Sequence, residues 1–205
     1  MRKSLREIAN DFGIVISHYN GGKIATVPDW DYVLGIPEFE ELATKGTTSR
    51  WHMEKNMFTH TQLVCEEMQK VISESNKEAI ASFSDDEKIV LMLAALFHDL
   101  GKCKCQNSED GKLLSNGHPA ISEKLCRKIL WNMDIVWRER VCEIVRWHDL
   151  YCSSDISEKK LCKKISELSP WLFIHIDLLY AMFRADDRGS IKPEELQGSS
   201  EKMVL

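Results

Sequence analysis

Two metal-binding side chains stand next to each other at the end of an apolar segment. His98 and Asp99 follow the run LMLAALF in LMLAALFHDLGK. Burying an imidazole beside a carboxylate is unfavourable unless both groups are paired. A divalent cation would pair with both, so the dipeptide predicts a metal site at the end of a buried helix.

Two further histidines lie at the ends of segments with helical periodicity. His60 begins HTQLVCEEMQKV, in which Val64, Met68 and Val71 fall on the face of the imidazole. His148 ends VWRERVCEIVRWH, whose apolar residues share its stripe. Both imidazoles are therefore expected to point toward the core.

His118 and Asp186 add an imidazole and a carboxylate from other parts of the chain. His118 lies in the Gly/Pro turn of SNGHPAIS, just before another expected helix. Asp186 follows WLFIHIDLLYAMFRA, a segment so apolar on all sides that we expect it to form the central, most buried helix. The six candidate ligands then occur in the order H, HD, H, H, D.

This order resembles the HD superfamily of metal-dependent phosphohydrolases, which is named for its His-Asp pair. The segments that carry the resemblance are WHMEKNMFTHTQLV, LAALFHDLGK, NGHPAISEKLCRKIL, VRWHDL and FRADDRG. They are most similar to the HD domain attached to some bacterial tRNA nucleotidyltransferases, the CCA-adding enzymes, over roughly residues 36–190. The resemblance implies an all-α fold, an HD-domain helical bundle with the metal site between the central helices.

Other branches of the superfamily fit the sequence less well. The residues after the pair read HDLGKCKC, whereas deoxynucleotide triphosphohydrolases resemble HDIGHPPFG and alarmone hydrolases resemble HDVVEDT. The Gly-Tyr-Pro signature of cyclic-dinucleotide phosphodiesterases does not occur. The nucleotidyltransferase domain that precedes the HD domain in CCA-adding enzymes is missing too, so we do not expect this chain to add CCA.

The ligand types indicate the metal and its chemistry. The expected ligands of a first metal are His60, His98, Asp99 and Asp186. Imidazoles with carboxylates suit Mn, Fe, Co, Ni or Zn better than Mg, and we expect one or two such ions. The metal would activate water and polarise a phosphoryl oxygen. His118 and His148 complete a second metal site or hold the phosphate; with a single metal, either is the natural general acid.

Positively charged side chains near the ligands are candidates for substrate contacts. Lys102 lies one turn beyond Asp99, where its ammonium would reach the same pocket and take part in catalysis as a point charge. Arg184 and Arg188 flank Asp186; one of them could hold a phosphate oxygen, or they form ion pairs with Asp187 or another surface carboxylate. His52 is a candidate substrate contact because a Trp-His dipeptide recurs at this place in the similar domains; a structural role is its alternative.

Four other residues are set apart from the site. His175 lies in the middle of an apolar segment and is expected to be a core residue, and Asp177 is the carboxylate to test if Asp186 fails. Cys103 and Cys105 lie close to Asp99, but their C-x-C spacing is not a common zinc arrangement, and imidazole and carboxylate better serve metals that hydrolyse phosphate.

The chain of 205 residues is expected to fold as one HD domain, residues 46–190, with an N-terminal extension over 1–45 and a polar tail over 191–205. In the extension, LREIANDFGIV predicts a short amphipathic helix, and VPDWDYVLGIPEFEEL a loop. The GGK at 21–23 lacks the spaced first glycine and the Ser or Thr of a phosphate-binding loop, so it indicates a simple turn.

Composition limits the partners. A net charge of −5 argues against a surface for long nucleic acids, and the lysine-rich stretches around 124–128 and 159–164 are expected to be solvated faces. No apolar run is long enough to span a membrane. Seven cysteines without a C-x-x-C pair favour reduced thiols and a cytoplasmic setting. The six tryptophans fit a core or a homodimer face equally well.

These observations predict a metal-dependent phosphohydrolase, a phosphoric ester hydrolase, that acts on small nucleotides or RNA-end phosphates. The resemblance implies 2',3'-cyclic phosphodiesterase, 2'-nucleotidase or phosphatase activity. The alternative is a non-catalytic module that uses the HD fold to bind a nucleotide or a protein.

Overall fold

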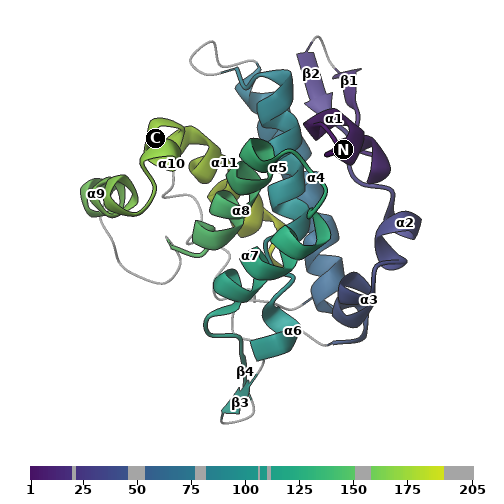
Figure 1. The fold of residues 1–205 in the computed structure, drawn as a ribbon. Helices are drawn as coiled ribbons and strands as arrows, with labels where there is room; N and C mark the ends of the chain where they lie inside the picture. Colours follow the sequence, from purple (N-terminus) through teal and green to yellow (C-terminus); the bar gives the residue numbers. More distant parts are fainter. Residues whose placement is uncertain are drawn as a thin grey trace.

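The computed structural model of the protein describes residues 1–19, 22–45, 54–76, 82–105, 107–109, 112–150 and 158–191. Helices make up most of these residues, so the predicted all-α fold is confirmed (Figure 1). The helices are α1 (Leu5–Asp11), α2 (Trp30–Leu34), α3 (Pro37–Thr44), α4 (Met57–Ser75), α5 (Asp85–Phe97), α6 (Lys102–Cys105), α7 (His118–Ile129), α8 (Ile135–Trp147), α9 (Glu158–Leu168), α10 (Pro170–Ile174) and α11 (Ile176–Gly189). Two antiparallel hairpins pair β1 (Ile16–Tyr19) with β2 (Gly22–Ala25) and β3 (Asn107–Glu109) with β4 (Lys112–Leu114).

Helix α5 is the central, most buried helix. Ser84 and Glu87 form a capping box that satisfies its first amide groups, and the acidic first turn matches the positive end of the helix dipole. Every side chain of the apolar run 89–97 is buried. The helix lies in the middle of the bundle and packs against α1, α4, α8 and α11 (Figure 1).

The expectation that residues 171–185 form the central helix is wrong. The segment breaks at His175, which ends α10 and precedes α11, and Ile174 is 75% exposed. Helix α11 is amphipathic: it buries Leu178 and Met182, whereas Asp177 is exposed. The polar positions of the segment share a solvated face, so the uninterrupted apolar run of α5 occupies the centre instead.

Helix α4 carries His60 as predicted. Asn56 caps it by accepting a hydrogen bond from the Thr59 amide at 2.8 Å. Val64 and Met68 are fully buried on the same side as His60. The helix packs along α5 and α11, which places the start of α4 beside the ligands on those helices.

Residues 1–45 contain more structure than the sequence indicates. The predicted short helix is α1; Gly22 and Lys23 of the GGK stretch lie in β2, which pairs with β1, whereas Gly21 lies outside the described residues. The predicted loop at 27–42 is wrong, because α2 and α3 form there. Phe12 and Phe39 pack on Phe97, with ring centroids 5.5 and 5.6 Å away. This part of the chain therefore shares the core of the bundle. The boundary at residue 45 between the N-terminal extension and the HD domain stays a prediction.

The lysine-rich helices have solvated faces, as expected. In α9, Lys159, Lys160, Lys163 and Lys164 are exposed, whereas Leu161 and Ile165 are fully buried. In the part of the chain that the structure describes, no helix has both the length and the apolar character needed to cross a bilayer.

Candidate metal centre

Six side chains from five helices and their ends meet at one buried point. His98 ends α5 and His148 ends α8, and in each case the imidazole follows a buried helix into the same region. His60 comes from the first turns of α4 and Asp186 from the last turns of α11. The fold thus brings together all six predicted ligands, which are four imidazoles and two carboxylates from distant parts of the sequence.

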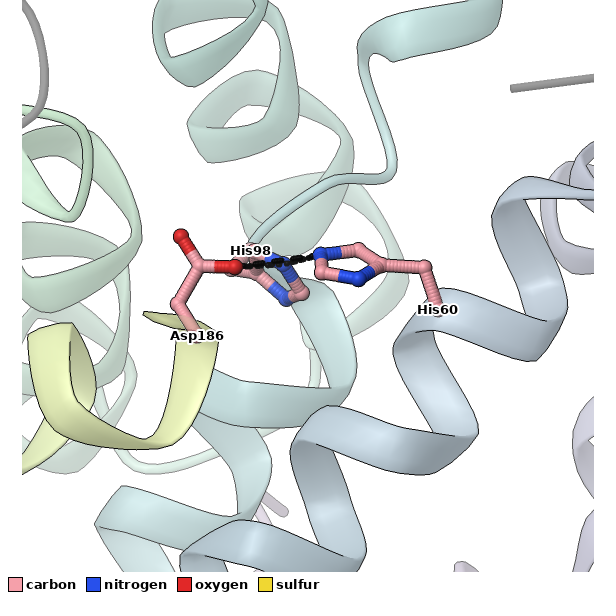
Figure 2. A group of neighbouring side chains, drawn as sticks. All are labelled: His60, His98 and Asp186. Carbon is pink, nitrogen blue, oxygen red and sulfur yellow. Dashed lines mark hydrogen bonds and ion pairs between the residues drawn. The ribbon is translucent and has the colours of Figure 1, made fainter. Parts of the chain in front are cut away.

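His60, His98 and Asp186 form one half of the cluster (Figure 2). The His60 Nε2 atom lies 3.0 Å from Asp186 Oδ1 and 3.3 Å from His98 Nε2. The His98 Nε2 atom lies 3.6 Å from the same carboxylate oxygen. Asp99 adds its Oδ2 atom, at 3.2 Å from His98 Nε2 and 3.3 Å from His60 Nε2.

His118, His148 and the other oxygen of Asp99 form the second half. The two Nε2 atoms lie 3.2 Å apart, and they are 3.1 Å (His118) and 3.6 Å (His148) from Asp99 Oδ1. Asp99 therefore lies between the two halves and offers one oxygen to each. This arrangement can hold either one metal or two.

Two glycines allow His118 to reach this position. Gly117, at the N-cap of α7, has a φ of 81°, a backbone conformation that residues with a Cβ rarely adopt. A Cβ on Gly101 would lie 2.5 Å from the His118 carbonyl oxygen and 2.6 Å from the Ser122 amide. The turn after Asp99 and the start of α7 can therefore touch only because residue 101 has no side chain.

Backbone carbonyl groups fix the orientation of three ligand histidines. In each, Nδ1 lies within hydrogen-bonding distance of the carbonyl oxygen three residues earlier. The distances are 2.8 Å from His98 to Ala95, 2.9 Å from His118 to Ser115 and 2.7 Å from His148 to Val145. A carbonyl only accepts, so Nδ1 carries the proton and Nε2 is left to bind a metal.

The cluster is buried but keeps an open side. His60, His98, Asp99 and His148 have almost no exposed side-chain surface. The side chains of Asp186, Lys102 and His118 are 17%, 13% and 9% exposed. A substrate would therefore approach from the side of these three residues.

The charged groups of the cluster depend on one another. Burial disfavours the charged form of His98, but the carboxylates of Asp99 and Asp186 outweigh this effect and raise the pKa of the imidazole to about 10. Burial opposes ionisation of Asp99 as well, yet His98 and Lys102 hold the pKa of this carboxyl well below its usual range. The His148 pKa is lowered, mainly by burial. The two carboxylates thus favour positive charge at this position, and a bound metal ion would supply it.

The residues present fit a divalent metal. Both oxygens of Asp99 are buried without a hydrogen bond of good geometry, and the Lys102 ammonium forms an ion pair with Oδ2. Buried carboxylate oxygens in this state are costly unless a cation binds them. They lie among four Nε2 atoms, and imidazole with carboxylate is a donor set for divalent transition metals.

Lys102 reaches the cluster as predicted. Its Nζ atom lies 2.5 Å from Asp99 Oδ2, on the side of the half that contains His60 and His98. Burial by itself would lower the pKa of this ammonium, but Asp99 and Asp186 outweigh burial and raise it. A fixed positive charge therefore stands at the edge of the site.

Arg184 and Arg188 are engaged elsewhere. Arg184 Nη2 donates to Glu74 Oε2 at 2.9 Å, and Arg188 Nη1 donates to Glu74 Oε1 at 3.0 Å. This is the surface ion pair that was the alternative to a phosphate contact, so the structure gives the phosphate contact no support. His52, the other predicted substrate contact, lies outside the described residues.

Three residues that were not expected among the ligands, His175, Asp177 and Cys103, lie outside the cluster. His175 is not a core residue: it is about one-third exposed, stacks on Trp171 and lies 3.6 Å from Glu87. Asp177 is exposed, which removes the reason to consider it as a ligand. The Cys103 thiol contacts Met57, and burial raises its pKa to about 11.

Glu54 is the residue that sequence reasoning missed. Its side chain is buried, and Oε1 lies 3.5 Å from His60 Nδ1. The signal lay in the WHMEK segment, where Glu54 matches the glutamate of the W-H-x-E-G pattern in the similar domains. A single glutamate ahead of a helix is common on surfaces, so this match did not single it out as part of the site.

Comparison with known families agrees with this geometry. The model of the HD domain matches residues 54–171, more than half of the chain. The match includes His60, His98, Asp99, His118 and His148, and Asp186 joins them from outside it through α11. No curated protein matches the sequence. With the ligand order found first in the sequence and then assembled around Asp99, this match places the chain in the HD-domain family.

Proposed function

We propose that the protein is a metal-dependent phosphohydrolase that acts on small nucleotides or RNA-end phosphates. The observation that carries the proposal is Asp99, whose two buried oxygens face two pairs of histidines. HD-domain proteins are generally hydrolases that bind divalent metals. His60, His98, Asp99 and Asp186 would hold one ion, and His118 and His148 would hold a second together with Asp99.

A divalent metal bound there would act as a Lewis acid and lower the pKa of a water molecule enough to make it a nucleophile. The residues of the chain have separate tasks. Lys102, with its ammonium beside Asp99, would hold a phosphoryl oxygen of the substrate on the open side of the cluster. His118, which keeps some exposure and has its Nδ1 fixed by Ser115, would donate an Nε2 proton to the leaving oxygen when only one ion is bound.

The substrate class rests on the resemblance of five sequence segments to the HD domain attached to bacterial tRNA nucleotidyltransferases. That resemblance suggests 2',3'-cyclic phosphodiesterase, 2'-nucleotidase or phosphatase activity. In the first of these reactions, water adds to phosphorus and one ester bond to the ribose breaks, which leaves a ribose 2'- or 3'-phosphate.

The test is hydrolysis of 2',3'-cyclic AMP by the full chain with Mn²⁺, Co²⁺ or Ni²⁺ added in turn. We expect metal-dependent turnover by the wild type and a loss of at least about 100-fold in Asp99→Ala, because the variant removes an oxygen from both halves. Asp177→Ala is the matched control, since Asp177 is exposed on α11 and contacts none of the ligands. Equal rates in the wild type and Asp99→Ala would exclude catalysis by this cluster. If neither turns over with any metal, the non-catalytic binding module becomes the better description.

A further inference from the structure

One ligand of the cluster is oriented differently from the other three. His98, His118 and His148 lie at helix ends, where the carbonyl group three residues earlier accepts from Nδ1. His60 lies inside α4, and the carbonyl three residues before it, on Met57, already accepts a hydrogen bond from the Thr61 hydroxyl at 3.2 Å. The orientation of His60 therefore depends on a group from outside its helix.

Glu54 is placed to supply that group. Its Oε1 atom lies 3.5 Å from His60 Nδ1, and both side chains are buried. The second ring nitrogen of His60 faces away from His98 and Asp186 (Figure 2), so a contact at Nδ1 leaves Nε2 directed at the cluster. A carboxylate is a stronger acceptor than a carbonyl, and it makes a ligand imidazole more basic.

The same carboxylate also contacts the chain that follows α11. The Ile191 amide donates to Glu54 Oε1 at 2.7 Å. Ile191 comes five residues after Asp186, whose Oδ1 lies 3.0 Å from His60 Nε2. One buried oxygen thus lies 3.5 Å from His60 Nδ1 and accepts from the amide of Ile191, just beyond the helix that carries Asp186; His60 and Asp186 are two of the three ligands of the first half alone.

We propose that Glu54 is a positioning residue for the metal centre: it orients His60 and the end of α11, so that the half formed by His60, His98 and Asp186 is the tighter metal site. In the described part of the chain, the Nδ1 atoms of His118 and His148 in the second half meet backbone carbonyl groups, so this half does not depend on Glu54. The proposal rests on the metal site used in the proposed function, but it concerns metal affinity and makes no use of turnover.

The test measures Co²⁺ affinity of the full-length protein by competition with a fluorescent chelator. In a His148→Ala background, which leaves one complete half, we expect Glu54→Gln to weaken Co²⁺ binding about 10–100-fold. In an Asp186→Ala background, which leaves the other half, Glu54→Gln should change the affinity less than twofold. The visible spectrum of the bound Co²⁺ should change only in the first background, because only there does an affected imidazole bind the ion.

Glu74→Gln is the matched control. Glu74 is a carboxylate that also connects α4 to α11, through Arg184 and Arg188, but it does not contact a ligand. We expect it to leave Co²⁺ affinity within twofold of the wild type. If Glu74→Gln weakens binding as much as Glu54→Gln, the effect comes from loosening the two helices, and the proposal is wrong.

Three other results would overturn the proposal: wild-type affinity in the Glu54→Gln, His148→Ala protein, an equal loss in both backgrounds, or no Co²⁺ binding by the wild type. If Glu54→Gln does not fold, Glu54→Asp takes its place. That variant keeps the negative charge on a side chain one methylene shorter. In the His148→Ala background it should weaken Co²⁺ binding at least about 10-fold. Because these are binding measurements, a protein that binds metal as proposed yet hydrolyses nothing would contradict only the proposed function.

Discussion

Asp99 is the residue on which the cluster depends most. Its Oδ2 atom faces His60 and His98, and its Oδ1 atom faces His118 and His148. A single carboxylate shared in this way explains why the His-Asp pair stood out in the sequence: the imidazole belongs to one half, whereas the carboxylate belongs to both.

The shared carboxylate leads to a prediction about stoichiometry. We expect the wild type to bind two Co²⁺ ions per chain and His148→Ala to bind one, because the variant removes a ligand only from the second half. Equilibrium dialysis followed by elemental analysis measures the ratio. A wild-type ratio of one would instead assign His118 and His148 to the substrate phosphate.

Lys102 should matter for turnover and not for metal binding. We expect Lys102→Met to lower kcat about 100-fold, the usual effect of removing one positioned group that stabilises developing negative charge. Metal affinity should stay the same or rise, because the variant removes an ammonium that would repel the ion. Steady-state kinetics and metal titration measure the two effects. Lys104→Met is the control, since Lys104 pairs with Glu41 on the surface; unchanged kcat in Lys102→Met would refute the role.

At the scale of elements, the contact between the turn after Asp99 and helix α7 leaves no room for a side chain. In Gly101→Ala, the new Cβ would meet backbone atoms of His118 and Ser122, which cannot move without shifting α7. We expect a loss of about 1–3 kcal/mol in the free energy of unfolding, together with weaker metal binding by the second half. Urea unfolding measures the first effect. Gly35→Ala is the control, because its Cβ would lie 3.2 Å from the Tyr32 carbonyl oxygen and 3.9 Å from that of Asp31, far less crowded than at residue 101; equal losses in the two variants would contradict the argument.

The elements differ in how well the sequence predicted them. Local signals sufficed for α4 and α5, where a cap, a polar face or an apolar run defines the helix. They failed for α2 and α3: a segment with two prolines indicates a loop, but Pro37 occupies the first turn of α3, where proline is tolerated. They also missed the break at His175, which depends on how α10 and α11 pack.

The site was more predictable than its surroundings. Its six ligands are of types rarely buried without a partner; five of them lie at an end of an apolar segment, and His118 lies in a Gly/Pro turn just before a helix. The contacts of Arg184 and Arg188 with Glu74, and of Glu54 with His60, were not predictable. They join residues that are far apart in the chain or that have no periodic pattern, and only the folded structure brings them together.

For the whole molecule, the cluster is the point where α4, α5, α7, α8 and α11 meet. An ion bound there would link all five, and it would bind the folded state only. At a concentration of about 100 times Kd such binding stabilises by about 2.7 kcal/mol, or roughly 5–10 °C in Tm for a chain of this size. We expect Mn²⁺ or Co²⁺ to raise Tm by this amount, EDTA to reverse the rise, and Asp99→Ala to show no rise. A scanning fluorimetry series measures all three, and an equal rise in Asp99→Ala would place the ion elsewhere.

The N-terminal residues should be as important for stability as the helices around the cluster. Phe39 is fully buried against Phe97, one residue before His98. We expect Phe39→Ala to cost about 3–5 kcal/mol, as for other core phenylalanines. Tyr19→Ala, at an exposed position of β1, should cost far less. Similar urea midpoints for the two variants would show that residues 1–45 are an accessory to the bundle.

The carbonyl groups that orient His98, His118 and His148 belong to the backbone at Ala95, Ser115 and Val145. Every amino acid has this carbonyl, so no substitution at those three positions can delete the acceptor. His60 relies on the side chain of Glu54, which a single substitution can remove. The four imidazoles therefore differ in their tolerance to mutation. Three of them keep their acceptor whatever residue occupies the position that orients them, whereas a substitution of Glu54 removes the acceptor of His60.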